Sequence, residues 1–114
     1  MINPDGVANQ VEGGIIQTVS RALMEEVQFD RKQVTSVDWQ TYPILRFPAV
    51  PKVELKLIDR PDQPPWGAGE PALVVVPAAI GNAVYDATGV RLRSVPFTPA
   101  KVKAALAAAP AQRD

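Results

Sequence analysis

The sequence predicts an α+β fold in which two long helices pack on an antiparallel or mixed sheet and a short helix ends the chain. Apolar residues recur at helical spacing over residues 7–27 and again over 71–87. Between these segments, residues 52–59 alternate apolar and charged side chains, which is the pattern of a strand with one buried face. An order of helix, strand pair, strand, loop, helix, short strand and helix is typical of a layered domain.

The first predicted element is a long helix from about Val7 to Val27. Asn3 followed by Pro4 supplies start signals, because the asparagine side chain caps free N–H groups and proline suits the first turn. Gly13 and Gly14 interrupt the helix, and each costs about 1 kcal/mol relative to alanine. They indicate either close approach by a ligand or another backbone, or tight helix packing. The apolar positions of this helix are Val7, Val11, Ile15, Val19, Leu23 and Val27.

Extended structure is predicted for the middle of the chain. Val27–Phe29 and Val34–Trp39 flank a polar turn, so the simplest interpretation is a hairpin. Tyr42–Pro51 contains three prolines and favours an irregular extended path. Lys52–Asp59 is the strand with alternating side chains.

A loop and a second helix follow. Residues 60–69 read RPDQPPWGAG, a proline- and glycine-rich stretch that excludes regular structure at its tip. From Pro71 to about Ala87 the apolar spacing is helical, and Gly89 is a suitable C-terminal stop. Pro77 requires either a kink or a later start of this helix.

The end of the chain predicts a short strand and a short helix. Val90–Val95 suits the strand. Thr98 before Pro99 suits a side-chain cap followed by proline in the first helical turn, for a helix that runs to about Ala109.

Composition limits the chemistry that this chain can perform. With 114 residues and a mass of 12.3 kDa, it fits one domain. The absence of cysteine excludes disulfides, thiolate zinc sites, iron–sulfur clusters and cysteine nucleophiles within the chain. The absence of histidine excludes a Ser-His-Asp arrangement. Acid–base chemistry therefore requires carboxylates, lysine, tyrosine or a bound cofactor.

Charge and hydropathy argue against nucleic acid and membranes as partners. Twelve basic and twelve acidic residues are interspersed, so no basic field is expected to attract phosphates. No apolar run reaches the roughly 18 residues of a membrane span. The N-terminal stretch also lacks the basic and apolar regions of a signal peptide.

Among the carboxylates, Glu70 has the most distinctive setting. It follows Gly67, Ala68 and Gly69, which let a ligand reach the backbone, and it precedes Pro71 at the expected start of a helix. A helix N-terminus would favour the charged carboxylate, whereas burial beside Trp66 would raise its pKa. These features fit a helix cap as well as a catalytic base.

Gln10 and Glu12 are a second candidate pair, in the stretch N-Q-V-E-G-G of the first helix. The amide of Gln10 can donate and accept hydrogen bonds toward a ligand, and Gly14 leaves space on that side. Being two residues apart, Gln10 and Glu12 do not share a helix face. Both also fit surface positions without a functional role.

These segments together resemble the C-terminal end of the molybdopterin-binding subunit of the xanthine dehydrogenase and aldehyde oxidase family. The resemblance begins with I-N-P-D-G-V-A-N-Q-V-E-G-G, continues through Y-P-I-L-R-F-P-A-V-P and reaches G-A-G-E-P-A, similar to the family's G-x-G-E-P signature. The end, N-A-V-Y-D-A-T-G-V-R-L-R-S-V-P-F-T-P, looks most like the branch that contains the isoquinoline 1-oxidoreductase beta subunits. A lone G-x-G-E-P is weak evidence, but its spacing from Q-V-E-G-G and the tail behind it make the combination specific.

The resemblance implies an oxidoreductase that hydroxylates an aldehyde or an N-heteroaromatic carbon with oxygen from water. Glu70 matches the family's base, which takes the proton of a water-derived hydroxyl. Gln10 matches a glutamine that hydrogen-bonds near the pterin and the molybdenum, and Gly67, Ala68 and Gly69 match the loop that approaches the metal. The family holds its metal through the pterin sulfurs, so no side chain of this segment is expected to be a metal ligand.

The same resemblance gives expectations about the wider assembly. Residues 1–114 are expected to be a C-terminal fragment of a molybdopterin-binding domain, inactive alone and unable to retain its cofactor, molybdenum-molybdopterin in the cytosine dinucleotide form. Expected partners are the remainder of the molybdenum subunit and an iron–sulfur or cytochrome electron-transfer subunit, in bacteria and favouring the periplasm. The alternative is a truncated, non-catalytic binding or assembly module that self-associates into a homo-oligomer. Residues 61–66 as a proline-rich ligand are a weaker third interpretation.

Overall fold

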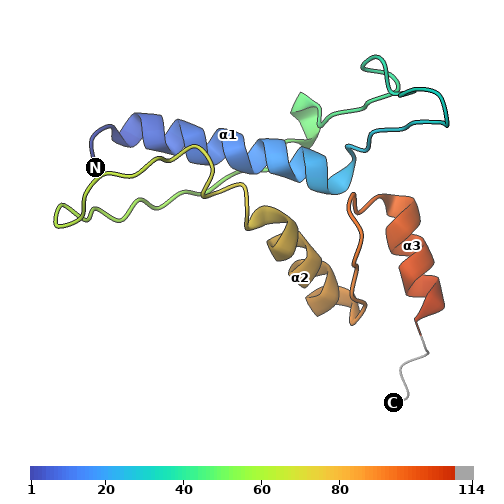
Figure 1. The fold of residues 1–114 in the computed structure, drawn as a ribbon. Helices are drawn as coiled ribbons and strands as arrows, with labels where there is room; N and C mark the ends of the chain where they lie inside the picture. The colour runs from blue at the N-terminus through green and yellow to red at the C-terminus, as the bar shows by residue number, and fades with distance from the viewer. Residues whose placement is uncertain (110–114) are drawn as a thin grey trace.

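Three α-helices and one short 3₁₀ helix make up the regular structure of residues 1–109, which are the residues that the computed structural model describes. The helices are α1 (Pro4–Leu23), α2 (Val76–Thr88) and α3 (Pro99–Ala108), and the 3₁₀ helix η1 spans Phe47–Ala49. Figure 1 shows α1 as the longest element, with α2 and α3 near its C-terminal half and a long irregular segment beside its N-terminal half. The last five residues of the predicted domain lie outside the described part of the chain.

Helix α1 begins and ends where local hydrogen bonds define its ends. The side chain of Asn3 accepts a hydrogen bond from the Gly6 N–H at 2.9 Å, which confirms the predicted cap. The helix ends at Leu23, four residues earlier than predicted. The chain turns away there because Ser20 and Glu25 hold a later segment: the Ser20 hydroxyl accepts from the Leu45 N–H at 2.9 Å, and the Tyr42 hydroxyl donates to Glu25 at 2.9 Å.

Helix α2 begins at Val76 rather than at Pro71. Pro71 instead occupies the second position of a turn in which the Leu73 N–H donates to the Glu70 carbonyl at 2.9 Å, a position that proline favours. The late start places Pro77 in the first turn of the helix, where its missing N–H costs nothing. Gly89 ends the helix in the left-handed conformation, with φ 69°, as predicted.

Helix α3 confirms the last predicted helix. The Thr98 side chain accepts from the Lys101 N–H at 3.3 Å, and proline follows in the first turn. The segment before α3 is tied to the end of α1, since the Phe97 N–H donates to the Ala22 carbonyl at 2.6 Å. Helix α3 itself is tied to the residues after α1, since the Lys101 amine pairs with Glu26 at 3.0 Å.

The predicted sheet is wrong. The hairpin reduces to a single antiparallel bridge between Phe29 and Val34 around a turn that Asp30 holds. Residues 52–59 and 90–95, the other predicted strands, form no strand within the described chain. Alternating side chains favour an extended backbone, but a sheet also needs a neighbouring strand, and residues 1–109 provide none. The α+β class is therefore replaced by a helical arrangement with long irregular connections.

The core is small. Ala22, Val76 and Phe97 are buried apolar residues, joined by the buried polar residues Thr18 and Ser20. The Cα radius of gyration is 17.9 Å, against about 13 Å for a compact domain of this length. Large apolar side chains are consequently exposed, among them Phe47 at 95%, Trp66 at 88% and Ile2 at 82%.

Close packing between elements depends on two glycines. A Cβ added to Gly14 of α1 would lie 3.3 Å from Leu73, just before α2, and one added to Gly81 of α2 would lie 3.6 Å from the ring of Phe97. Gly13 faces open space. The structure thus supports tight packing as the reason for Gly14, while it gives no packing reason for Gly13.

Candidate functional site

The glycine loop, residues 67–69, lies against helix α1. A Cβ added to Gly69 would lie 3.6 Å from Nε2 of Gln10, whereas one added to Gly67 would meet no atom within 4 Å. The Gln10 side chain is exposed in the second turn of α1. Two predicted site segments that are far apart in the sequence are therefore neighbours in space.

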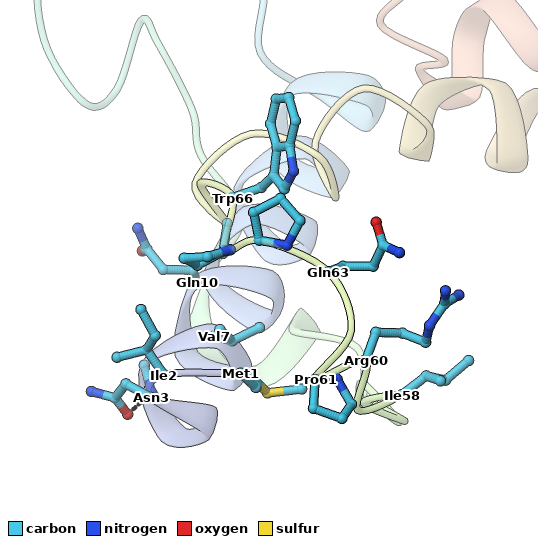
Figure 2. Close-up of a pocket in the computed structure, with 14 residues that line it drawn as sticks. Met1, Ile2, Asn3, Val7, Gln10, Ile58, Arg60, Pro61, Gln63 and Trp66 are labelled. Atoms are coloured by element: carbon cyan, nitrogen blue, oxygen red, sulfur yellow. Dashed lines mark hydrogen bonds between the residues drawn. The ribbon is translucent and has the colours of Figure 1, made fainter.

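A cavity of about 620 Å³ lies between the start of α1 and residues 58–68. Figure 2 shows Gln10, Val7 and Asn3 on its α1 side and Arg60, Gln63 and Trp66 on the loop side. Gln10 and Ala68 are the predicted site residues that line it. Most of its lining residues are exposed, so the cavity forms a cradle open to solvent.

Glu70 lines a different hollow. Gly67, Gly69, Glu70, Pro71 and Val74 surround a space of about 380 Å³. Gln10 does not line this space, so the structure brings Gln10 to the glycine loop but does not bring Gln10 and Glu70 into one cavity. The loop itself separates the two hollows.

The helix-cap interpretation of Glu70 does not hold. The N-cap of α2 is Val75, and no side chain caps that helix. The carboxylate of Glu70 is exposed and precedes a turn, while the indole of Trp66 is 88% exposed and provides no apolar pocket around it. Glu12 is likewise exposed on α1.

Sequence reasoning missed two polar side chains that line the larger cavity, Arg60 and Gln63. Arg60 forms two hydrogen bonds with Asp62, at 2.9 and 2.7 Å, and Gln63 donates to the same carboxylate at 2.9 Å. These bonds, first of all those from Arg60, hold the pKa of Asp62 far below its ordinary value. The only sequence signal was the presence of these polar groups within the proline-rich loop.

Side-chain metal ligands are not gathered anywhere in residues 1–109. No group of three or more carboxylates, histidines or cysteines there could hold a metal ion. Nor does any helix of these residues have the length and apolar character that crossing a membrane requires.

Comparison with known proteins adds the decisive observation. A family model described as the molybdopterin cofactor-binding domain matches residues 1–51, which include Gln10. A nicotinate dehydrogenase subunit of Pseudomonas putida is 47% identical over 106 residues, which are 93% of this chain and 9% of that protein. The chain belongs to the xanthine dehydrogenase and aldehyde oxidase family of molybdenum-binding subunits.

Further relatives in this family agree. The beta subunit of isoquinoline 1-oxidoreductase from Brevundimonas diminuta is 42% identical over 85% of this chain and 12% of its own length, which confirms the predicted relationship. The crystal structure of quinoline 2-oxidoreductase from Pseudomonas putida 86 superposes with a TM-score of 0.83 at 31% identity, covering 96% of this chain and 15% of that one. The chain thus spans only about a tenth of the length of these bacterial relatives.

Proposed function

We propose that this chain forms one edge of the cofactor site of a molybdenum hydroxylase, in which Glu70 is the general base and Gln10 contacts the pterin. The position of the Gln10 amide beside Gly69 supports this proposal most directly. It brings a hydrogen-bonding amide to a loop without bulky side chains, and Glu70 follows that loop and borders the hollow on its other side. The family resemblance assigns roles to these same three features.

The residues present fit one edge of a large polar ligand. The open space at Gly67 lets a ligand approach the backbone closely. The exposed Gln10 amide offers both a donor and an acceptor. When bound, molybdenum-molybdopterin supplies the redox chemistry and the water-derived oxygen, and the protein supplies position and a base.

The two hollows on either side of the glycine loop suggest where the cofactor and the substrate bind. Gln10, with Ala68, borders the larger cavity, and we assign the cofactor to that side. Glu70 borders the smaller hollow beyond Gly69, and we assign the reacting carbon of the substrate to that side. There the carboxylate would accept a proton from a water-derived hydroxyl held beside an electron-poor carbon of an aldehyde or an N-heteroaromatic ring, while the bound cofactor would supply the redox chemistry.

We further propose that residues 1–114 are a C-terminal fragment of the molybdopterin-binding domain, active only with the remainder of the molybdenum subunit. The open cradle leaves most of a bound ligand in water, so the isolated chain is expected to lose the cofactor. The cytosine dinucleotide form, the iron–sulfur or cytochrome partner and the periplasm extend this proposal on the family resemblance.

A chimera tests the proposal. The matching segment of the Pseudomonas putida nicotinate dehydrogenase is replaced by this chain, and molybdenum content and nicotinate turnover are measured. Glu70→Gln in the chimera should reduce turnover per bound molybdenum by about two to four orders of magnitude, the range for loss of a positioned base. Because glutamine has nearly the same shape as glutamate, cofactor loading and thermal stability should remain as in the unsubstituted chimera.

Asp86→Asn is the matched control, since Asp86 is an exposed carboxylate on α2 remote from the glycine loop in sequence. It should leave turnover unchanged. Near-normal turnover in the Glu70→Gln chimera would remove Glu70 from the mechanism.

The exposed aromatic side chains favour a second candidate function, a non-catalytic assembly module. Phe47 and Trp66 are 95% and 88% exposed, which is unusual for side chains of this size in a soluble monomer. A chimera that folds but carries no molybdenum would support this alternative.

A further inference from the structure

Residues 51–59 have a backbone without partners. Among the hydrogen bonds of residues 1–109, none uses an N–H or a C=O group of this segment. Figure 1 shows the segment as an extended trace beside the N-terminal half of α1. Free N–H and C=O groups on an extended backbone form a template for another strand.

The side chains of this segment suit pairing with themselves. The sequence Lys-Val-Glu-Leu-Lys-Leu over residues 52–57 alternates charged and apolar positions, and Ile58 ends the alternation. In an antiparallel pair of two identical strands with Leu55 opposite Leu55, Glu54 of each copy lies opposite Lys56 of the other. Val53 then lies opposite Leu57, so one face is apolar. The other face carries two Glu54–Lys56 pairs at its centre and a Lys52–Ile58 pair at each end.

Other registers are less favourable. If one strand is shifted by one residue relative to the other, charged side chains lie beside apolar ones on the same face. A shift of two residues places Glu54 opposite Glu54, or Lys56 opposite Lys56, and like charges directly opposite repel. Larger shifts bring Pro51 or Pro61 into the ladder, where proline cannot donate a hydrogen bond.

We propose that residues 52–58 pair with the same residues of a second copy of this chain, as a two-stranded antiparallel ladder centred on Leu55. The ion pair that exists within one copy does not oppose this. Lys52 and Glu54 lie 2.9 Å apart, but their side chains are 84% and 81% exposed, so the pair is weak and easily exchanged. Leu55 is 40% exposed and free to meet its counterpart.

A single cysteine tests the geometry, because the chain has none of its own. Leu55→Cys places two sulfurs at the centre of the proposed ladder, where opposite Cβ atoms lie about 4.5–5.5 Å apart and a small adjustment brings them into disulfide range. Mild oxidation should convert most of this variant into a covalent dimer. Leu106→Cys is the matched control, since Leu106 is 44% exposed but lies on α3, and it should remain monomeric on non-reducing gels. Equal cross-linking of both variants would overturn the proposal.

Charge exchange tests the register. Glu54→Lys and Lys56→Glu should each raise the dimer dissociation constant about tenfold. Each substitution places like charges opposite one another at two symmetry-related positions of the dimer. The double variant restores opposite charges between the two copies, so the dimer dissociation constant should return to within about threefold of its original value. Sedimentation measures these values, and circular dichroism checks that helix content is unchanged.

Failure of the double variant to restore association would contradict the proposed register. A monomeric unsubstituted chain at about 100 µM would contradict the ladder itself and assign this edge to a strand of another polypeptide. Neither measurement depends on molybdenum or turnover, so the outcome is independent of the proposed function.

Discussion

The role of Glu70 depends on where the following helix begins. Had α2 started at Pro71, the carboxylate would have been placed to cap it, and its presence would need no further explanation. Because Val75 is the N-cap, Glu70 lies in an exposed turn and does not cap the free N–H groups of α2. A structural reason for this side chain is thereby removed, which strengthens the case for a chemical one.

Gln10 permits a test of cofactor contact that is separate from catalysis. Gln10→Ala should change the free energy of unfolding by less than about 0.5 kcal/mol, because the side chain is exposed. Loss of one hydrogen bond should reduce cofactor retention by the chimera about two- to tenfold. Gln17→Ala, another exposed glutamine on α1, is the control. Equal molybdenum content in both variants would contradict the proposed contact.

At the scale of single elements, local signals were reliable and pairing signals were not. Asn3 and Thr98 predicted helix starts and Gly89 predicted a helix end, because each acts on backbone groups a few residues away. Pro71 misled, because proline fits the second position of a turn as well as the first turn of a helix.

The sheet failed for a related reason. Alternation in residues 52–59 predicts extended backbone, but which strand completes the ladder is a long-range property that the segment does not encode. For the site, the resemblance assigned both Gln10 and the glycine loop to the cofactor, and they lie near one another, while their roles stay predictions. Arg60 and Gln63 carried no comparable motif, and their place beside the cavity depends on how the loop lies across α1.

The paired glycines of α1 offer an internal comparison. Gly13→Ala should stabilise the chain by about 0.5–1 kcal/mol, since alanine favours helix and its Cβ meets nothing within 4 Å. Gly14→Ala gains the same helix preference but crowds Leu73 at 3.3 Å, so it should be about 1 kcal/mol less stable than Gly13→Ala. Urea unfolding measures both. Equal gains would show that Leu73 moves aside without cost.

The turn at residues 38–41 should respond to acid. Hydrogen bonds from the Thr41 N–H and hydroxyl and from the Gln40 N–H hold the pKa of Asp38 below its ordinary value of 3.8. A lowered folded-state pKa contributes stability above the ordinary value, and that contribution is lost as pH falls through the folded-state pKa. The amide resonance of Thr41 should therefore titrate with a midpoint below 3.8. A midpoint at or above 3.8 would contradict these bonds.

For the whole molecule, stability rests on few buried side chains. Phe97 is 8% exposed and packs beside Gly81, whereas Phe47 is 95% exposed. Phe97→Ala should cost about 3 kcal/mol or more, enough to separate the helices of so small a core. Phe47→Ala, which removes the same atoms, should cost less than about 0.5 kcal/mol in the monomer. Similar urea midpoints for the two variants would show that Phe97 is not part of the core.

The unpaired 51–59 segment also makes the chain sensitive to proteolysis. Proteases bind their substrates as extended strands, and trypsin cleaves after lysine or arginine. Lys52 and Lys56 lie within this segment, so the bonds after them are open to cleavage before those inside the helices, whereas the bond after Arg60 is protected by Pro61. A cut after Lys56 would leave Gln10 and Glu70 on separate peptides. Any strand that covers this edge would therefore also protect the connection between the two halves of the candidate site.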